Sequence, residues 1–214
     1  MKFKKKVGCY TLLKEVSSDA FIKDGKIRKP IDFKPGLNVV LGGEIGDNSI
    51  GKSTFLMIID FVFGGNDYPK KEAIAIKNVG NHTIKFEFDF NGKSYFFTRS
   101  TSDSNTVKLC NENYEPLQNW QVEEYGKFLA KKYGMNTSED SFRSVVSPFG
   151  RIARRETFSV EEPLKHYGTE SKTDQIQCLL KLYGRYDNIH ELKRIKDVDT
   201  ENLSVFNKAN KNKL

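Results

Sequence analysis

The sequence predicts a fold of the α/β class with marked α+β character, and three observations carry this prediction. A glycine-rich segment, residues 46–54, lies between an apolar run and a helical pattern. Residues 84–109 alternate apolar and polar side chains over short strands, which is typical of an antiparallel β-meander. The last part of the chain has helical spacing and ends in a polar, lysine-rich stretch. We therefore expect an α/β lobe around the glycine-rich segment, a β-meander subdomain, a helical region and the start of a coiled-coil stem.

The composition is that of a chain with one sizeable core. Its 214 residues suffice for one domain with an appendage, and we expect a lobe over residues 1–172 and a helical or coiled-coil stem start over 173–214. No apolar run approaches the roughly 20 residues of a membrane helix, and the basic start has no leader pattern, so we expect a cytoplasmic protein without a membrane partner. The net charge of +7 permits contact with nucleic acid without demonstrating it.

The first 45 residues predict a small antiparallel ribbon. Asp24-Gly25 lies between short apolar stretches and indicates a hairpin turn. Pro30–Phe33 and the turn at Pro35-Gly36 indicate another short strand. Leu37–Leu41 is apolar and β-branched, which predicts a buried parallel strand directly before the glycine-rich segment.

The glycine-rich segment fits the phosphate-loop pattern G-x-x-x-x-G-K-[ST]. Its predicted ligand-binding residues are Gly46, Asp47, Asn48, Ser49, Ile50, Gly51, Lys52, Ser53 and Thr54. The two glycines allow backbone N–H groups to point inward and bind anions. In this pattern Lys52 reaches the β- and γ-phosphates and the Ser53 hydroxyl ligates Mg²⁺. The segment therefore predicts a site for ATP with Mg²⁺, and Lys52 is its one catalytic candidate.

The stretch Thr54–Phe63 is apolar on every face and predicts a fully buried helix, which ends at Gly64-Gly65. Residues 66–81 are polar and predict a surface loop. Asn91-Gly92 is a strong hairpin signal between the strands at residues 84–90 and 95–98, and residues 106–109 supply a third strand.

The later elements are predicted from apolar spacing. A helix is expected over Asn119–Tyr133, with Trp120 at its start as a core residue. Ser141–Val146 suits either a strand or a short helix. Thr173 is the expected cap of a further helix. The apolar positions at residues 189, 192 and 195 begin an amphipathic stretch, although three sustained heptads cannot be counted.

Hydrolysis by a P-loop enzyme also needs a carboxylate on a second strand, which holds Mg²⁺ and positions water. Asp60 lies inside the helix that follows the phosphate loop, so it cannot occupy the tip of a neighbouring strand. The stretch Leu41–Glu44 abuts the phosphate loop and cannot clamp a partner subunit's nucleotide. Either another chain or further sequence completes the enzyme, or this chain only binds nucleotide.

Three stretches together carry a family resemblance: Phe33–Gly42, Gly46–Ser53 and Phe61–Gly64. With them the chain resembles the N-terminal half-head of a P-loop NTPase, an SMC-like ATPase of the ABC superfamily, which includes chromosome-maintenance and double-strand-break-repair proteins. The form of the loop is similar to that of a bacterial branch, some of whose members act in defence against foreign DNA. The resemblance implies a C-terminal half-head that carries the signature motif and magnesium carboxylates, a second copy in a head-to-head dimer, and DNA as a partner.

The same resemblance implies that Thr54 donates on the α-phosphate side and that the isolated chain binds ATP weakly and hydrolyses it negligibly. The family's metal-contacting glutamine is expected near Phe142–Ile152. No Gln occurs there, and Ser147 is the nearest candidate Mg²⁺ ligand.

Two other functions are compatible with the motif. A stand-alone P-loop kinase or transferase would use Arg151, Arg154 and Arg155 as a lid, but the β-meander argues against such an enzyme because these kinases alternate strands and helices. A non-enzymatic nucleic-acid-binding module would bind DNA in a salt-dependent way that ATP does not affect.

Overall fold

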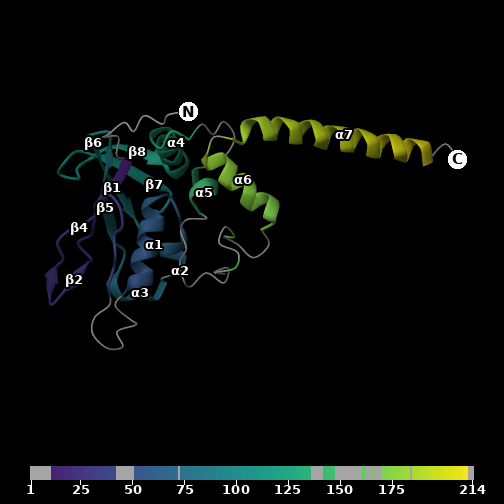
Figure 1. The fold of residues 1–214 in the computed structure, drawn as a ribbon. Helices are drawn as coiled ribbons and strands as arrows, with labels where there is room; N and C mark the ends of the chain where they lie inside the picture. Colours follow the sequence, from purple (N-terminus) through teal and green to yellow (C-terminus); the bar gives the residue numbers. More distant parts are fainter. Residues whose placement is uncertain are drawn as a thin grey trace. The chain divides into compact units, whose positions relative to one another are not determined.

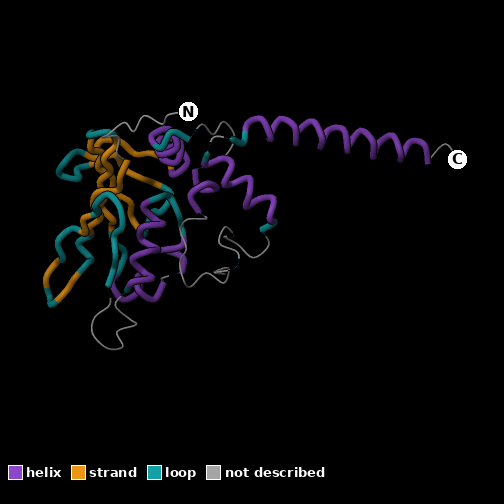
Figure 2. The backbone as a smooth tube through the Cα atoms, viewed as in Figure 1, coloured by secondary structure: helices purple, strands orange, loops and turns teal. Residues whose placement is uncertain are grey.

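The computed structural model describes residues 11–41, 51–71, 73–135, 142–147, 161, 165, 170–183 and 185–211. It consists of two compact units, Met1–Gly168 and Thr169–Leu214, which are described separately here (Figure 1). The first unit contains a mostly antiparallel sheet with helices packed on it, which confirms the predicted mixture of α/β and α+β character (Figure 2).

The main sheet has six strands in the order β4-β1-β5-β6-β7-β8. Their bounds are Thr11–Ser17 for β1, Ile31–Asp32 for β4, Thr83–Phe90 for β5, Lys93–Ser100 for β6, Thr106–Cys110 for β7 and Pro116–Gln121 for β8. Asn91 and Gly92 adopt φ values of 60° and 78°, which a tight hairpin turn requires. The predicted meander is confirmed, and β8 is a strand that the sequence patterns did not indicate.

A separate two-stranded hairpin precedes the sheet's edge strand. It pairs β2 (Ile22–Lys23) with β3 (Lys26–Ile27), and the turn residues Asp24 and Gly25 have φ values of 52° and 72°. The predicted turn is therefore confirmed.

The prediction of a buried parallel strand at Leu37–Leu41 is wrong. These residues are irregular, and Leu37 and Leu41 are 91% and 79% exposed. A parallel strand needs neighbours on both sides, and among the described residues every strand pair is antiparallel and none includes this segment.

Helix α1, Lys52–Val62, is the predicted helix after the glycine-rich segment. Gly64, with φ +86°, follows its end as expected. The prediction of burial on every face is wrong, because Leu56 is 45% exposed. The opposite side carries Met57 and Phe61, which join the phenylalanines of β5 in the core.

The predicted surface loop over residues 66–81 is wrong, because this segment contains two short helices. They are α2 (Asp67–Lys71) and α3 (Ala73–Val79). The ring of Tyr68 is buried against Phe61 with 5.9 Å between centroids, which anchors α2 to α1. Pro69 falls in the first turn of α2, where a missing N–H breaks no helical hydrogen bond.

Helix α4, Val122–Lys132, begins three residues later than predicted. The Gln121 N–H donates to the Glu124 carboxylate at 3.0 Å, which satisfies the helix start there. Trp120 therefore belongs to β8, and its expected core role is confirmed by ring contacts with Phe97 and Phe128 at 5.8 and 5.2 Å. The short helix α5 covers Phe142–Val146.

The second unit contains α6 (Lys172–Leu182) and α7 (Asp187–Lys211). Ser171, and not Thr173, caps α6: its Oγ accepts the Asp174 N–H, and the Asp174 carboxylate accepts the Ser171 N–H, both at 3.2 Å. Within the described residues, no helix has the length and apolar character needed to cross a membrane.

Candidate functional site

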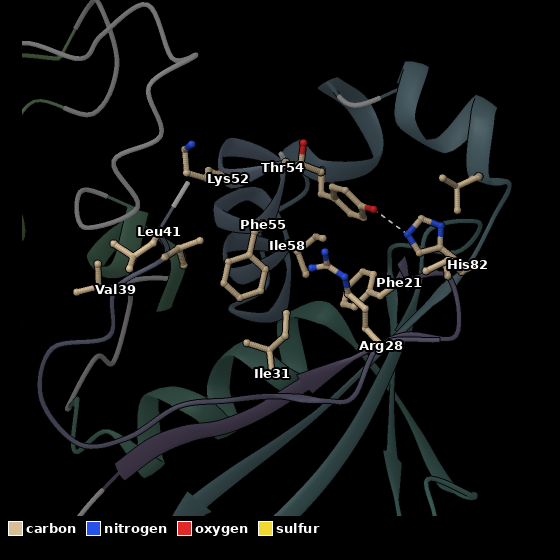
Figure 3. A pocket seen from close by; sticks show the side chains of 16 residues that line it. Phe21, Arg28, Ile31, Val39, Leu41, Lys52, Thr54, Phe55, Ile58 and His82 are labelled. Carbon is tan, nitrogen blue, oxygen red and sulfur yellow. Dashed lines mark hydrogen bonds between the residues drawn. The ribbon is translucent and has the colours of Figure 1, made fainter. Parts of the chain in front are cut away.

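A cavity of about 620 Å³ lies at the N-terminal end of α1 within the first unit (Figure 3). This volume falls in the range of small-molecule sites. The lining residues come from the β2–β3 hairpin region, the segment before the phosphate loop, α1 and the segment that leads to β5. They are Ala20, Phe21, Ile22, Arg28, Ile31, Val39, Val40, Leu41, Gly51, Lys52, Thr54, Phe55, Ile58, Tyr68, Val79 and His82.

The start of α1 opens toward this cavity. Gly51 is its N-cap residue with φ +78°, a left-handed conformation that favours glycine. Gly51 has no side chain that could cap this helix end, and the first helical bond runs from the Phe55 N–H to the Gly51 carbonyl at 2.8 Å. The first-turn N–H groups and the positive end of the helix dipole therefore favour an anion at this wall.

Three of the predicted phosphate-loop residues line the cavity together: Gly51, Lys52 and Thr54. Ser53 lies in the first turn of α1, and Ser147 directly follows α5; neither belongs to the lining set. Their role as Mg²⁺ ligands stays a prediction. The remaining predicted residues lie outside the described part of the chain, and they are Gly46, Asp47, Asn48, Ser49 and Ile50.

The cavity combines cationic and apolar walls. Lys52 and Arg28 contribute positive charge, and no Asp or Glu of the described residues lines it. Phe21, Ile31 and Phe55 are among its apolar side chains. This arrangement suits a ligand with an anionic part and a flat apolar part, and a nucleotide has both.

A hydrogen-bonded pair from two segments lines the cavity wall near β5. The Tyr68 hydroxyl and His82 Nε2 are 2.7 Å apart, and His82 Nδ1 is 2.8 Å from the Gly80 carbonyl (Figure 3). Since a carbonyl only accepts, Nδ1 carries a proton, and in the neutral ring Nε2 then accepts a hydrogen bond that the Tyr68 hydroxyl donates. The sequence patterns missed this pair because the segment that holds Tyr68 was predicted as a loop.

A buried arginine anchors the opposite end of α1. Arg99 of β6 is 1% exposed, and its guanidinium donates to the carbonyls of Phe61 and Gly65 at 2.6 and 2.8 Å. It also donates to the Ser104 carbonyl at 2.9 Å and lies 3.9 Å from the centroid of the Phe61 ring. Burial lowers the pKa of Arg99 to about 10, so the side chain stays charged at neutral pH.

An ion pair joins the same end of α1 to α5. Arg143 Nη2 is 2.8 Å from Asp60 Oδ1, and the Asp60 side chain is almost completely buried. The expectation that Asp60 lies within the helix is confirmed, and its carboxylate forms the ion pair with Arg143. The cavity at one end of α1 is thus supported by two charged contacts at the other.

Comparison with protein-family models matched residues 22–214 to a model described as an AAA domain. The match begins at β2 and includes all the cavity residues of α1. No curated protein and no solved structure matched the chain. The family match indicates ATP binding and hydrolysis, in general with Mg²⁺. The chain belongs to the AAA domain family of P-loop ATPases.

Proposed function

We propose that this chain is the ATP-binding half of an SMC-like ATPase head, which hydrolyses ATP once a C-terminal half-head completes it. The observation that carries the proposal is the position of Gly51, Lys52 and Thr54, which line one cavity together at the N-terminal end of α1. The family match supports the nucleotide class, and the cationic and apolar walls support a nucleotide over an uncharged metabolite.

In this proposal each residue of the phosphate loop has a defined task. The amides of Gly46–Thr54 surround the phosphates, and Lys52 binds the β- and γ-phosphates. Ser53 ligates Mg²⁺, which neutralises phosphate charge. Thr54 donates on the α-phosphate side. Ser147 is the candidate second Mg²⁺ contact.

The exposed segment Leu37–Leu41 supports the need for a second half. It has a strand-forming sequence, yet it lies exposed beside the cavity and pairs with no other described strand. A half-head that adds a neighbouring strand would bury these side chains. The same half would supply the carboxylate that the described cavity residues lack, so the isolated chain should hydrolyse ATP negligibly.

The proposal extends to partners. A second copy would close the ATP site in a head-to-head dimer, and α7 would begin a coiled-coil stem. The net charge of +7 favours association with DNA, in repair, chromosome maintenance or defence against foreign DNA. We assign the chain to the bacterial branch because of the form of its phosphate loop.

Binding of MgATP to the full chain, measured by titration calorimetry, tests the site. Lys52→Ala should weaken binding by about tenfold or more, since a charge-assisted contact is lost. Lys77→Ala, which removes the same charge from an exposed position on α3, should leave affinity unchanged. Equal binding by all three proteins, or ATP turnover that survives Lys52→Ala, would contradict the assignment.

The two alternative functions make different predictions. A kinase or transferase would transfer phosphate to nucleosides or metabolites. Its lid candidates Arg151, Arg154 and Arg155 lie outside the described residues, and the observed meander β5–β8 disfavours this class. A nucleic-acid-binding module would bind DNA equally well with or without ATP and after Lys52→Ala.

A further inference from the structure

We propose that Arg28 is a specificity-determining residue that stacks its guanidinium on the base of the bound nucleotide. This inference rests on the proposed function and deepens it, because it assigns a base contact to a residue outside the phosphate loop. It predicts that the site distinguishes a nucleotide from a bare polyphosphate.

The β2–β3 hairpin places Arg28 at the cavity. Arg28 directly follows β3, and its backbone N–H donates to the Phe21 carbonyl at 2.6 Å, which closes the hairpin base. In Figure 3 the Arg28 side chain projects into the cavity from the hairpin side, toward α1, which carries Phe55 and Ile58. The hairpin therefore fixes the Arg28 backbone beside the cavity.

The surroundings of this guanidinium point to an aromatic ligand. Arg28 forms no side-chain hydrogen bond or ion pair with the described residues, and no carboxylate among them lines the cavity. The neighbouring walls are apolar, including Phe21 and Ile31. A guanidinium is weakly hydrated and stacks on flat π-systems, so the face of a heteroaromatic base is a suitable partner.

The order of residues along the cavity agrees with this role. In Figure 3 Lys52 and His82 lie on opposite sides of Phe55 and Ile58, with Arg28 on the His82 side. A triphosphate held by Lys52 and Thr54 would direct its sugar and base away from Lys52. The base would then enter the compartment that contains Arg28.

The experiment compares two probes, ATP and inorganic tripolyphosphate, both with Mg²⁺, by titration calorimetry on the full chain. Arg28→Met removes the guanidinium and keeps an unbranched apolar stem. Arg28→Lys keeps the charge and removes the flat face. Lys23→Met removes one charge from β2 of the same hairpin, at an exposed position outside the cavity lining, and is the matched control. Thermal melting of each variant checks folding.

We expect Arg28→Met to weaken ATP binding by about 3- to 30-fold, the range of a cation–π contact, and to change tripolyphosphate binding by less than about twofold. Arg28→Lys keeps a cation near the base without the flat face, so it should recover only part of the ATP affinity. Lys23→Met should match the unmodified chain for both probes.

Three results would overturn the inference: unchanged ATP binding in Arg28→Met, equal losses for both probes, or full ATP affinity in Arg28→Lys. Equal losses for both probes would show that Arg28 contacts phosphate. Full ATP affinity in Arg28→Lys would show that Arg28 acts only through its charge. Failure of the proposed function has a separate signature, since Lys52→Ala would then bind both probes as the unmodified chain does.

Discussion

Arg99→Met tests whether the buried guanidinium holds the phosphate-loop helix in place. The substitution keeps much of the side-chain volume and removes donors to the carbonyls of Phe61, Gly65 and Ser104. It also removes the contact with the Phe61 ring. Each hydrogen bond from a charged donor contributes about 1.5–3 kcal/mol, and a buried acceptor without a partner costs about 1–3 kcal/mol.

These contributions share one side chain and do not add in full. We therefore expect the free energy of unfolding to fall by about 3–5 kcal/mol, roughly the contribution of two such hydrogen bonds. A domain of this type has a total stability of about 5–15 kcal/mol, so the change is large. Arg99→Lys retains the charge without the planar fork and should recover only about half of the loss.

Urea denaturation followed by tryptophan fluorescence measures this effect. The chain has one tryptophan, Trp120, whose ring lies 5.8 Å from that of the core residue Phe97, so its emission reports on the unit that contains Arg99. Lys108→Met, at an exposed position on β7, is the control. A loss below about 1 kcal/mol for Arg99→Met, similar to the surface control, would refute the reasoning.

Three further predictions concern the same unit. Arg143→Met should lower the free energy of unfolding by about 3 kcal/mol, because the Asp60 carboxylate stays buried without its ion-pair partner. In a double-mutant cycle, adding Asp60→Asn to Arg143→Met should recover part of this loss, and additive losses would exclude coupling between the two side chains. Gly65→Ala should cost about 3 kcal/mol in urea denaturation, since its Cβ would lie 1.9 Å from Asp60 Oδ2; an unchanged midpoint would contradict this close approach. Burial raises three tyrosine pKa values above the usual 10.0, so their contribution to stability is complete below that pH and is lost as pH rises further. Near-ultraviolet phenolate absorbance should show them titrating only as the chain unfolds, and earlier titration of all nine tyrosines would contradict it. The three tyrosines with raised pKa values are Tyr114, Tyr125 and Tyr133.

The sequence predicted the elements whose causes are local. Asn91-Gly92 specifies its hairpin through two residues, and α1 follows from a continuous helical run with a glycine at each end. The prediction of a strand at Leu37–Leu41 was wrong because a strand needs neighbouring strands, and the pattern of a single segment carries no information about them. The prediction of a loop at residues 66–81 was wrong because the segment is mostly polar, although Tyr68 within it packs against Phe61 of α1.

The candidate site was predictable only in its phosphate-binding part. Gly51, Lys52 and Thr54 belong to a motif with fixed spacing, and the structure brings them to one cavity. Arg28 lies in a lysine-rich stretch that resembles an ordinary solvated surface, and Arg99 lies on a strand whose neighbours did not indicate burial. Both roles depend on contacts between segments far apart in the chain, and residue spacing alone does not specify them.

The pairing of β1 with β5 has a consequence for the order of folding. Thr11 lies opposite Phe90 and Ser17 opposite Lys85. The chain between β1 and β5, which contains α1 and the cavity residues, is therefore one long connection between two adjacent strands. Closing so long a loop loses more chain entropy than forming the turns of β5–β8, so we expect β5–β8 to assemble first. A ligand bound at the start of α1 would stabilise this closed connection, and slower hydrogen exchange of the β1 amides would report that the cavity is occupied.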